Sequence, residues 1–102
     1  MPEYQEQAKM QKMIEEVMAS EQIINIYGNA FICFNTNADM GIIIQKNNKA
    51  IAIINLSYST AKTLGEKLTN MVRDFEKTTD HTIMTINIID EKLKKLVKKE
   101  VV

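Results

Sequence analysis

Residues 40–64 read MGIIIQKNNKAIAIINLSYSTAKTL, and this stretch decides the fold. Two isoleucine-rich runs, residues 40–45 and 50–56, have the composition of β-strands. Between them lies Lys46-Asn47-Asn48-Lys49, and asparagine tolerates the left-handed backbone conformation that tight hairpins require. Ser57 then provides an N-cap, because its hydroxyl can accept a hydrogen bond from a free amide in the first turn of a helix. The stretch therefore predicts a β-hairpin followed directly by a helix.

The predicted helix covers residues 58–77 and is amphipathic. Its apolar positions recur at the helical period and form one face: Ala61, Leu64, Gly65, Leu68, Met71, Val72 and Phe75. A glycine within a helix costs about 1 kcal/mol relative to alanine. We therefore interpret Gly65 as a point where the helix approaches the sheet closely.

Upstream of the hairpin, residues 22–27 and 30–34 are rich in isoleucine and aromatic residues and are also predicted to be strands. Residues 35–39 contain turn-forming Asn and Asp, so they are predicted to be a second hairpin turn. Gly28-Asn29 has two interpretations, a two-residue turn or a bulge within one long strand.

The two ends of the chain complete the predicted architecture. Residues 3–20 are predicted to be a helix with one apolar stripe: Met10, Met13, Ile14, Val17 and Met18. Residues 82–89 alternate weakly and are predicted to be a last strand, after which Asp90 caps a short lysine-rich helix over residues 91–102. The prediction is a single α+β domain over residues 1–102: an antiparallel strand meander followed by a long amphipathic helix, with an N-terminal helix and a short C-terminal strand and helix.

Composition narrows the classes of function. The 102 residues carry 13 basic and 13 acidic side chains, and residues 22–45 contain no basic residue. Nucleic-acid binding is therefore not expected, because a protein that binds phosphates usually carries a basic excess. No run approaches the ~20 apolar residues that span a bilayer, and the polar N-terminus does not resemble a secretory signal. A single cysteine, Cys33, agrees with a reducing compartment. We expect a soluble, cytoplasmic protein that does not bind membranes.

No constellation of residues predicts an enzyme, a metal site or a cofactor site. His81 is the only histidine, and no ligands at zinc- or iron-like spacing accompany it. Cys33 lies between apolar neighbours without a nearby base, so a buried and unreactive thiol is expected. The hydroxyls of residues 57–60 are explained by helix capping. The lysines of residues 92–99 are interpreted as a solvated helix face.

Local patterns in the centre of the chain resemble a prokaryotic or phage family known only as domain of unknown function 3467. The resemblance covers residues 27–83 and rests on four matches: Tyr27-Gly28-Asn29, residues 34–44, residues 56–64 and Phe75-Glu76. The family usually has proline after the capping serine, where this chain has Tyr58. The resemblance implies a strand meander followed by a helix, and it implies no activity and no site residues.

The strand region carries apolar side chains on both faces, which an antiparallel sheet with one face in water should not do. The helix over residues 58–77 is expected to cover one face, and the N-terminal helix or a second subunit the other. We therefore predict a non-enzymatic binding or adaptor module that acts as a homo-oligomer, a dimer or higher, and that can bind a protein partner. The candidate interface residues are Met10, Met13, Val17, Met18, Ile51 and Ile53. Two alternatives stay open: a holdase-like chaperone for extended apolar peptides, and a small-molecule (nucleotide) binding or sequestering protein with its site at a subunit interface.

Overall fold

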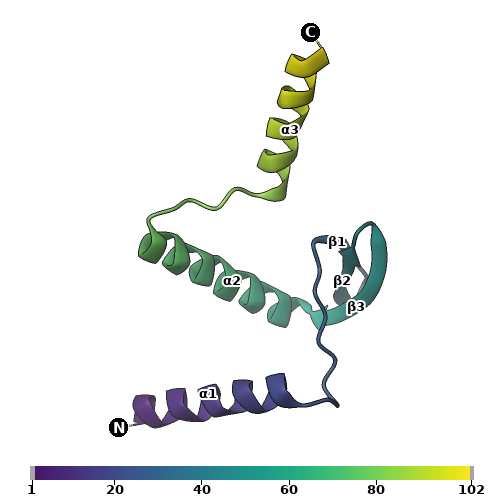
Figure 1. Cartoon of the computed structure of the whole chain (residues 1–102). Helices are drawn as coiled ribbons and strands as arrows, with labels where there is room; N and C mark the ends of the chain where they lie inside the picture. Colours follow the sequence, from purple (N-terminus) through teal and green to yellow (C-terminus); the bar gives the residue numbers. More distant parts are fainter. Residues whose placement is uncertain (1, 102) are drawn as a thin grey trace. The chain divides into compact units, whose positions relative to one another are not determined.

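The computed structural model describes residues 2–101, and side-chain environments over residues 3–97 (Figure 1). The elements in chain order are α1 (Pro2–Ala19), β1 (Ala30–Asn35), β2 (Asp39–Lys46), β3 (Lys49–Ser57), α2 (Tyr58–Thr79) and α3 (Ile86–Val101). The chain forms two compact units, one over residues 1–36 and 41–55 and the other over residues 37–40 and 56–102.

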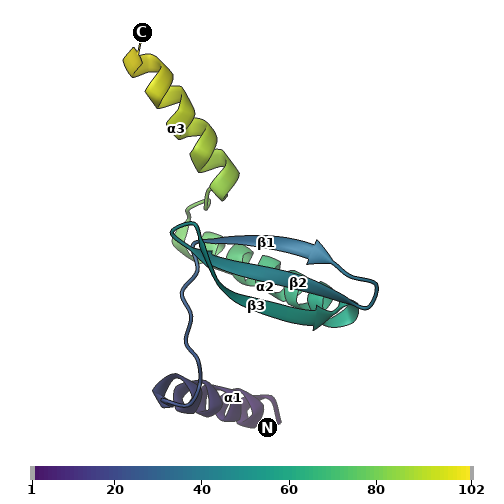
Figure 2. The same ribbon diagram turned by 90° about the vertical axis from the view of Figure 1, so that its right-hand side faces the viewer.

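The three strands form one sheet in the order β1-β2-β3, and Figure 2 shows them side by side. Each strand is hydrogen-bonded to the next one in the sequence, so the sheet is an antiparallel meander. The helix α2 follows β3 without an intervening loop. The predicted α+β class, with a meander followed by a long helix, is confirmed.

The turn between β2 and β3 explains why these two strands pair. Asn47 and Asn48 have φ angles of 52° and 69°, the paired left-handed values of a type I′ turn. Asn29 braces this turn, because its side-chain amide donates to Asn47 Oδ1 at 3.1 Å and its Oδ1 accepts from the Asn47 amide at 3.2 Å. The backbone amide of Asn29 also donates to the Gln45 carbonyl at 3.0 Å. The predicted asparagine hairpin is confirmed, and β1 begins beside the end of β2.

Replacing Asn47 by valine is expected to destabilise the protein by roughly 2 kcal/mol. A β-branched residue is strained at positive φ, and the hydrogen bond that the Asn29 side-chain amide donates to Asn47 Oδ1 is lost. Asn48→Gly is the control in the same turn. Glycine adopts the positive φ of residue 48 without strain, so this variant should be as stable as the unmodified protein or slightly more stable. Urea unfolding followed by circular dichroism measures both variants. Equal stability of the two would contradict the role assigned to the turn.

Both ends of α2 are capped, and the N-terminal cap is the one that the sequence predicts. Ser57 Oγ accepts from the Thr60 amide at 3.2 Å, which confirms the N-cap. At the other end Asp80 adopts the left-handed conformation, with φ of 54°, and its amide donates to the Glu76 carbonyl. The Glu76 carboxylate also accepts from the Ile83 amide at 2.7 Å. The helix therefore begins at Tyr58, and its C-terminal turn ties the following segment to it.

Two predicted strands are wrong. Residues 22–27 form no strand in the described chain, although Asn29, two positions later, is bonded to β2. Residues 82–89 also form no strand, because helix α3 begins at Ile86. Thr85 caps this helix, accepting from the Ile88 amide at 3.3 Å, so Asp90 lies inside α3 and is not its cap. Over so few residues, the alternation of apolar and polar side chains does not distinguish a short strand from the first turn of a helix.

The described chain contains no buried apolar core. Gly41 is the only buried residue among residues 3–97. The Phe34 ring occupies the space that a Cβ on Gly41 would take, so this glycine permits close packing of β1 on β2. At Gly65, in contrast, a Cβ would meet no atom within 4 Å, so no neighbouring atom requires a glycine at this position of the helix. Residues 3–97 thus have ordered secondary structure, and no apolar side chain among them is buried.

Candidate functional site

The N-terminal helix α1 carries four of the six predicted interface residues. Met10, Met13, Val17 and Met18 follow one another at helical spacing, and all four side chains are exposed. Met18 is the most open of them, with 73% of its surface accessible. Unbranched, polarisable methionine side chains adapt to differently shaped apolar partners. This helix therefore presents a soft apolar stripe, which we call the methionine stripe.

The other two predicted interface residues lie on β3. Ile51 and Ile53 are two residues apart, so their side chains leave the same face of the strand. Both are exposed, and Ile53 has 59% of its surface accessible. Ile54, which points to the opposite face, is exposed as well. Both faces of the sheet therefore keep apolar surface in contact with water.

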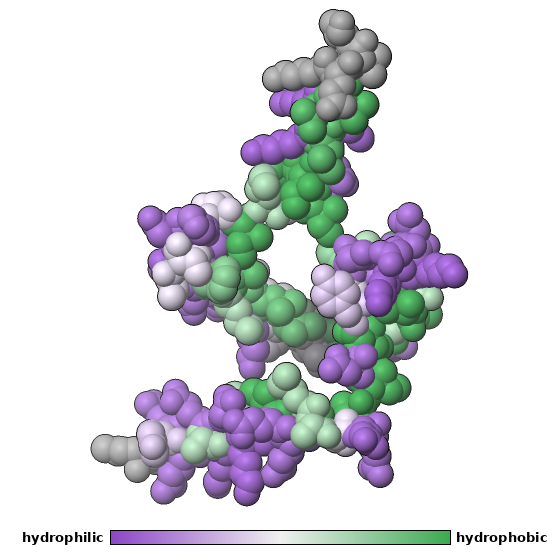
Figure 3. Space-filling view, viewed as in Figure 1, coloured by the Kyte–Doolittle hydropathy of each residue, from purple (hydrophilic) through white to green (hydrophobic). Residues whose placement is uncertain are grey.

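Two further apolar stripes were not predicted as interface, although their spacing is visible in the sequence. On α2 the exposed stripe consists of Leu64, Leu68, Met71, Val72 and Phe75. On α3 it consists of Ile86, Ile89, Leu93, Leu96 and Val97. Figure 3 shows apolar surface along both helices. Because a helical period of apolar residues is typical of core and interface alike, the sequence did not identify these stripes as open surface.

The candidate residues for chemistry are dispersed. His81 is exposed in the segment after α2, where its backbone amide donates to the Glu76 carbonyl at 3.2 Å. Cys33 is exposed on β1, so the prediction of a buried thiol is wrong for this chain. Within the described residues, no three His, Cys, Asp or Glu side chains are grouped closely enough to hold a metal ion. None of the described helices combines the length and apolar character needed to cross a bilayer.

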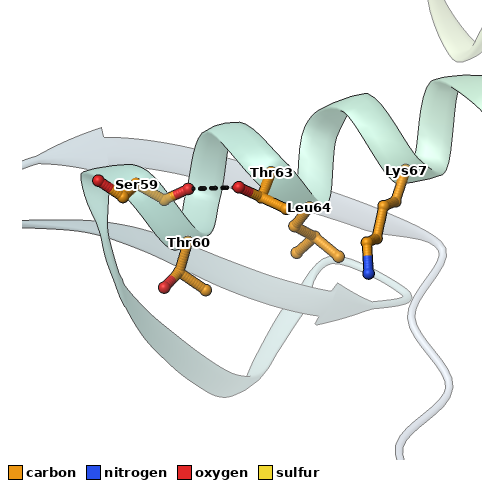
Figure 4. Close-up of a pocket in the computed structure, with 5 residues that line it drawn as sticks. All are labelled: Ser59, Thr60, Thr63, Leu64 and Lys67. Atoms are coloured by element: carbon orange, nitrogen blue, oxygen red, sulfur yellow. Dashed lines mark hydrogen bonds between the residues drawn. The ribbon is translucent and has the colours of Figure 1, made fainter.

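Two shallow depressions lie on the surface of α2. One is lined by Ser59, Thr60, Thr63, Leu64 and Lys67, and Figure 4 shows these side chains along the first turns of the helix. Thr63 Oγ1 donates to the Ser59 carbonyl at 2.9 Å, so this hydroxyl is occupied within the helix. A second depression involves Lys62, Gly65, Glu66, Thr69, Asn70 and Arg73. Both are open stretches of helix surface, so neither encloses a small molecule.

Comparison with protein-family models, with curated proteins and with solved structures finds no match for this chain. Of the described helices and strands, five present exposed large apolar side chains: α1, α2, α3, β1 and β3. The six predicted interface residues belong to this surface and make up only part of it. Such an arrangement is suited to association with other polypeptide surfaces, because apolar area is removed from water when they meet.

Proposed function

We propose that the protein is a non-enzymatic binding or adaptor module that acts as a homo-oligomer in the cytoplasm. The observation that carries the proposal is the absence of any buried apolar side chain among residues 3–97, although the secondary structure is fully formed. Isolated helices and a three-stranded sheet are marginal in water without a shared apolar interior. A second copy of the chain supplies apolar surface that can cover these elements, and it is always present at the same concentration as the first.

The charge balance supports the same conclusion. The 13 basic and 13 acidic side chains give a formal net charge of zero, so long-range repulsion between copies opposes association only weakly.

Light scattering of the full chain at micromolar concentration tests the proposal. We expect at least twice the subunit mass of 11.7 kDa. The midpoint of thermal unfolding should rise with protein concentration, because association stabilises the folded state by mass action. A folded species of monomer mass whose unfolding midpoint is independent of concentration would contradict the proposal.

A holdase-like chaperone is the second candidate, and the exposed methionine stripe supports it. Met10, Met13 and Met18 offer adaptable apolar contacts to an extended peptide. A chaperone of this kind suppresses aggregation of a chemically denatured model protein at near-stoichiometric ratio. The double variant M13Q/M18Q should lose this effect, whereas Q7A on the same helix should retain it. Absence of suppression by the unmodified chain would rule this candidate out.

The remaining sequence predictions stay proposals. A nucleotide-sequestering site would need a closed pocket with polar donors, and the depressions described on α2 are open. Such a site would therefore have to be completed between subunits. Two further predictions also remain: nucleic-acid binding that is weak or absent, and membership of the family that the sequence resembles, which would assign no activity.

A further inference from the structure

Residues 22–27, which read QIINIY, have the composition of a strand but no strand partner in their own chain. Within the described residues, no hydrogen bond joins the backbone of residues 23–28 to any other part of the chain. Ile24 and Tyr27 have 83% and 73% of their surfaces accessible. A segment rich in β-branched and aromatic residues thus leaves large apolar side chains in contact with water.

The connection to β1 limits where this segment can lie. Asn29 is bonded to Gln45 on β2 and to Asn47 in the turn, so only Gly28 separates Tyr27 from the sheet. Two residues span at most about 7 Å. Three strand spacings, about 14 Å, separate β1 from a strand added outside β3. Tyr27 therefore cannot pair with the outer edge of β3 in the same chain.

The outer edge of β3 is an unpaired strand edge with which residues 22–27 of another copy could form hydrogen bonds. At nine residues β3 is the longest strand, and it is a terminal strand of the sheet. Residues 50–56 contain no charge and no proline, the features that usually protect an edge from pairing with another chain. The strand therefore presents unpaired backbone amides and carbonyls along an apolar edge.

We infer that residues 22–27 of one copy form a fourth strand on the outer edge of β3 in a second copy, and that the exchange is reciprocal. The inference rests on the proposed homo-oligomer and specifies how it is built. Main-chain hydrogen bonds join segment and edge, while alternate isoleucines extend the apolar faces of the sheet. Each chain contains one unpaired segment, residues 22–27, and one unpaired edge, that of β3. In a dimer with two-fold symmetry both segments and both edges are therefore paired, and no further copy is needed.

An isotope-filtered NMR experiment on the full chain tests the inference directly. A mixed sample contains one copy labelled with ¹⁵N and ¹³C and one unlabelled, so that only contacts between copies are observed. We expect intermolecular cross-peaks between residues 23–27 and residues 50–56. An oligomer whose cross-peaks join β3 to β3, or residues 23–27 to β1, overturns the inference and leaves the proposed function intact. A monomer mass by light scattering overturns both.

A proline scan over residues 23–27 provides an independent test. In an edge strand the amides of alternate residues point into the ladder, so proline should disrupt association at every second position only. At those positions each proline variant should raise the dimer dissociation constant at least about tenfold over the alanine variant of the same residue. Each alanine variant removes the native side chain but keeps the backbone amide, so the difference between the proline and alanine variants reports the loss of the amide. Equal effects of proline and alanine at all five positions would overturn the inference.

Discussion

Replacing Ile53 by aspartate is expected to raise the dissociation constant of the oligomer at least about 100-fold, and to unfold much of the chain at micromolar concentration. Ile53 is 59% exposed in the single chain, and in the proposed oligomer a surface of another copy would bury it. Burying an isoleucine side chain contributes roughly 1.5–3 kcal/mol. An unpaired carboxylate at the same position adds a desolvation cost, so both effects oppose association.

Light scattering over a dilution series and circular dichroism measure this loss together. Asn55→Asp is the matched control, because it adds the same charge to the same strand without removing an apolar side chain. Ile53→Val should remain close to the unmodified protein. If Ile53→Asp leaves the mass unchanged while Met13→Glu dissociates the oligomer, the contact lies on the methionine stripe of α1 and not on β3.

Replacing Gly41 by valine is expected to destabilise the protein by roughly 2 kcal/mol, within the range known for overpacked sites. The Phe34 ring occupies the position of the missing Cβ, so the ring must swing away from the sheet. Valine favours strands, which offsets part of this cost but does not remove the steric conflict. Chemical unfolding at fixed chain concentration measures the difference in the free energy of unfolding.

The double variant F34A/G41V tests the cause of that loss. If the ring is the obstacle, the two substitutions together should cost at least about 1 kcal/mol less than the sum of the single effects. Gly65→Ala is the control, because a Cβ there meets no atom and alanine should stabilise α2 by about 1 kcal/mol. Full additivity of F34A and G41V would show that the ring does not constrain Gly41.

The sequence patterns predicted part of the exposed apolar surface, the six candidate interface residues, but not the further stripes on α2 and α3. The stripe containing Met10 and Met13 and the β3 pair Ile51 and Ile53 followed from helical and strand periodicity, and the structure leaves all four exposed. The stripes on α2 and α3 have equally clear periods. They were interpreted as ordinary core or helix faces, because periodicity states which side of an element is apolar and not what covers it. Cys33 was misplaced for the same reason, since apolar neighbours alone do not imply burial.

The sequence by itself determined the local features of this fold. The paired asparagines Asn47 and Asn48 specify a type I′ turn through backbone conformations that few residues adopt, and Ser57 specifies a helix start through a hydrogen bond within four residues. Only the tertiary structure decided the secondary structure of residues 22–27 and 82–89, neither of which forms the predicted strand. A strand exists only where a neighbouring strand satisfies its backbone, and the residues of a segment do not by themselves specify that neighbour. Residues 86–89 joined a helix, because helical hydrogen bonds are made within the segment itself and need no such neighbour.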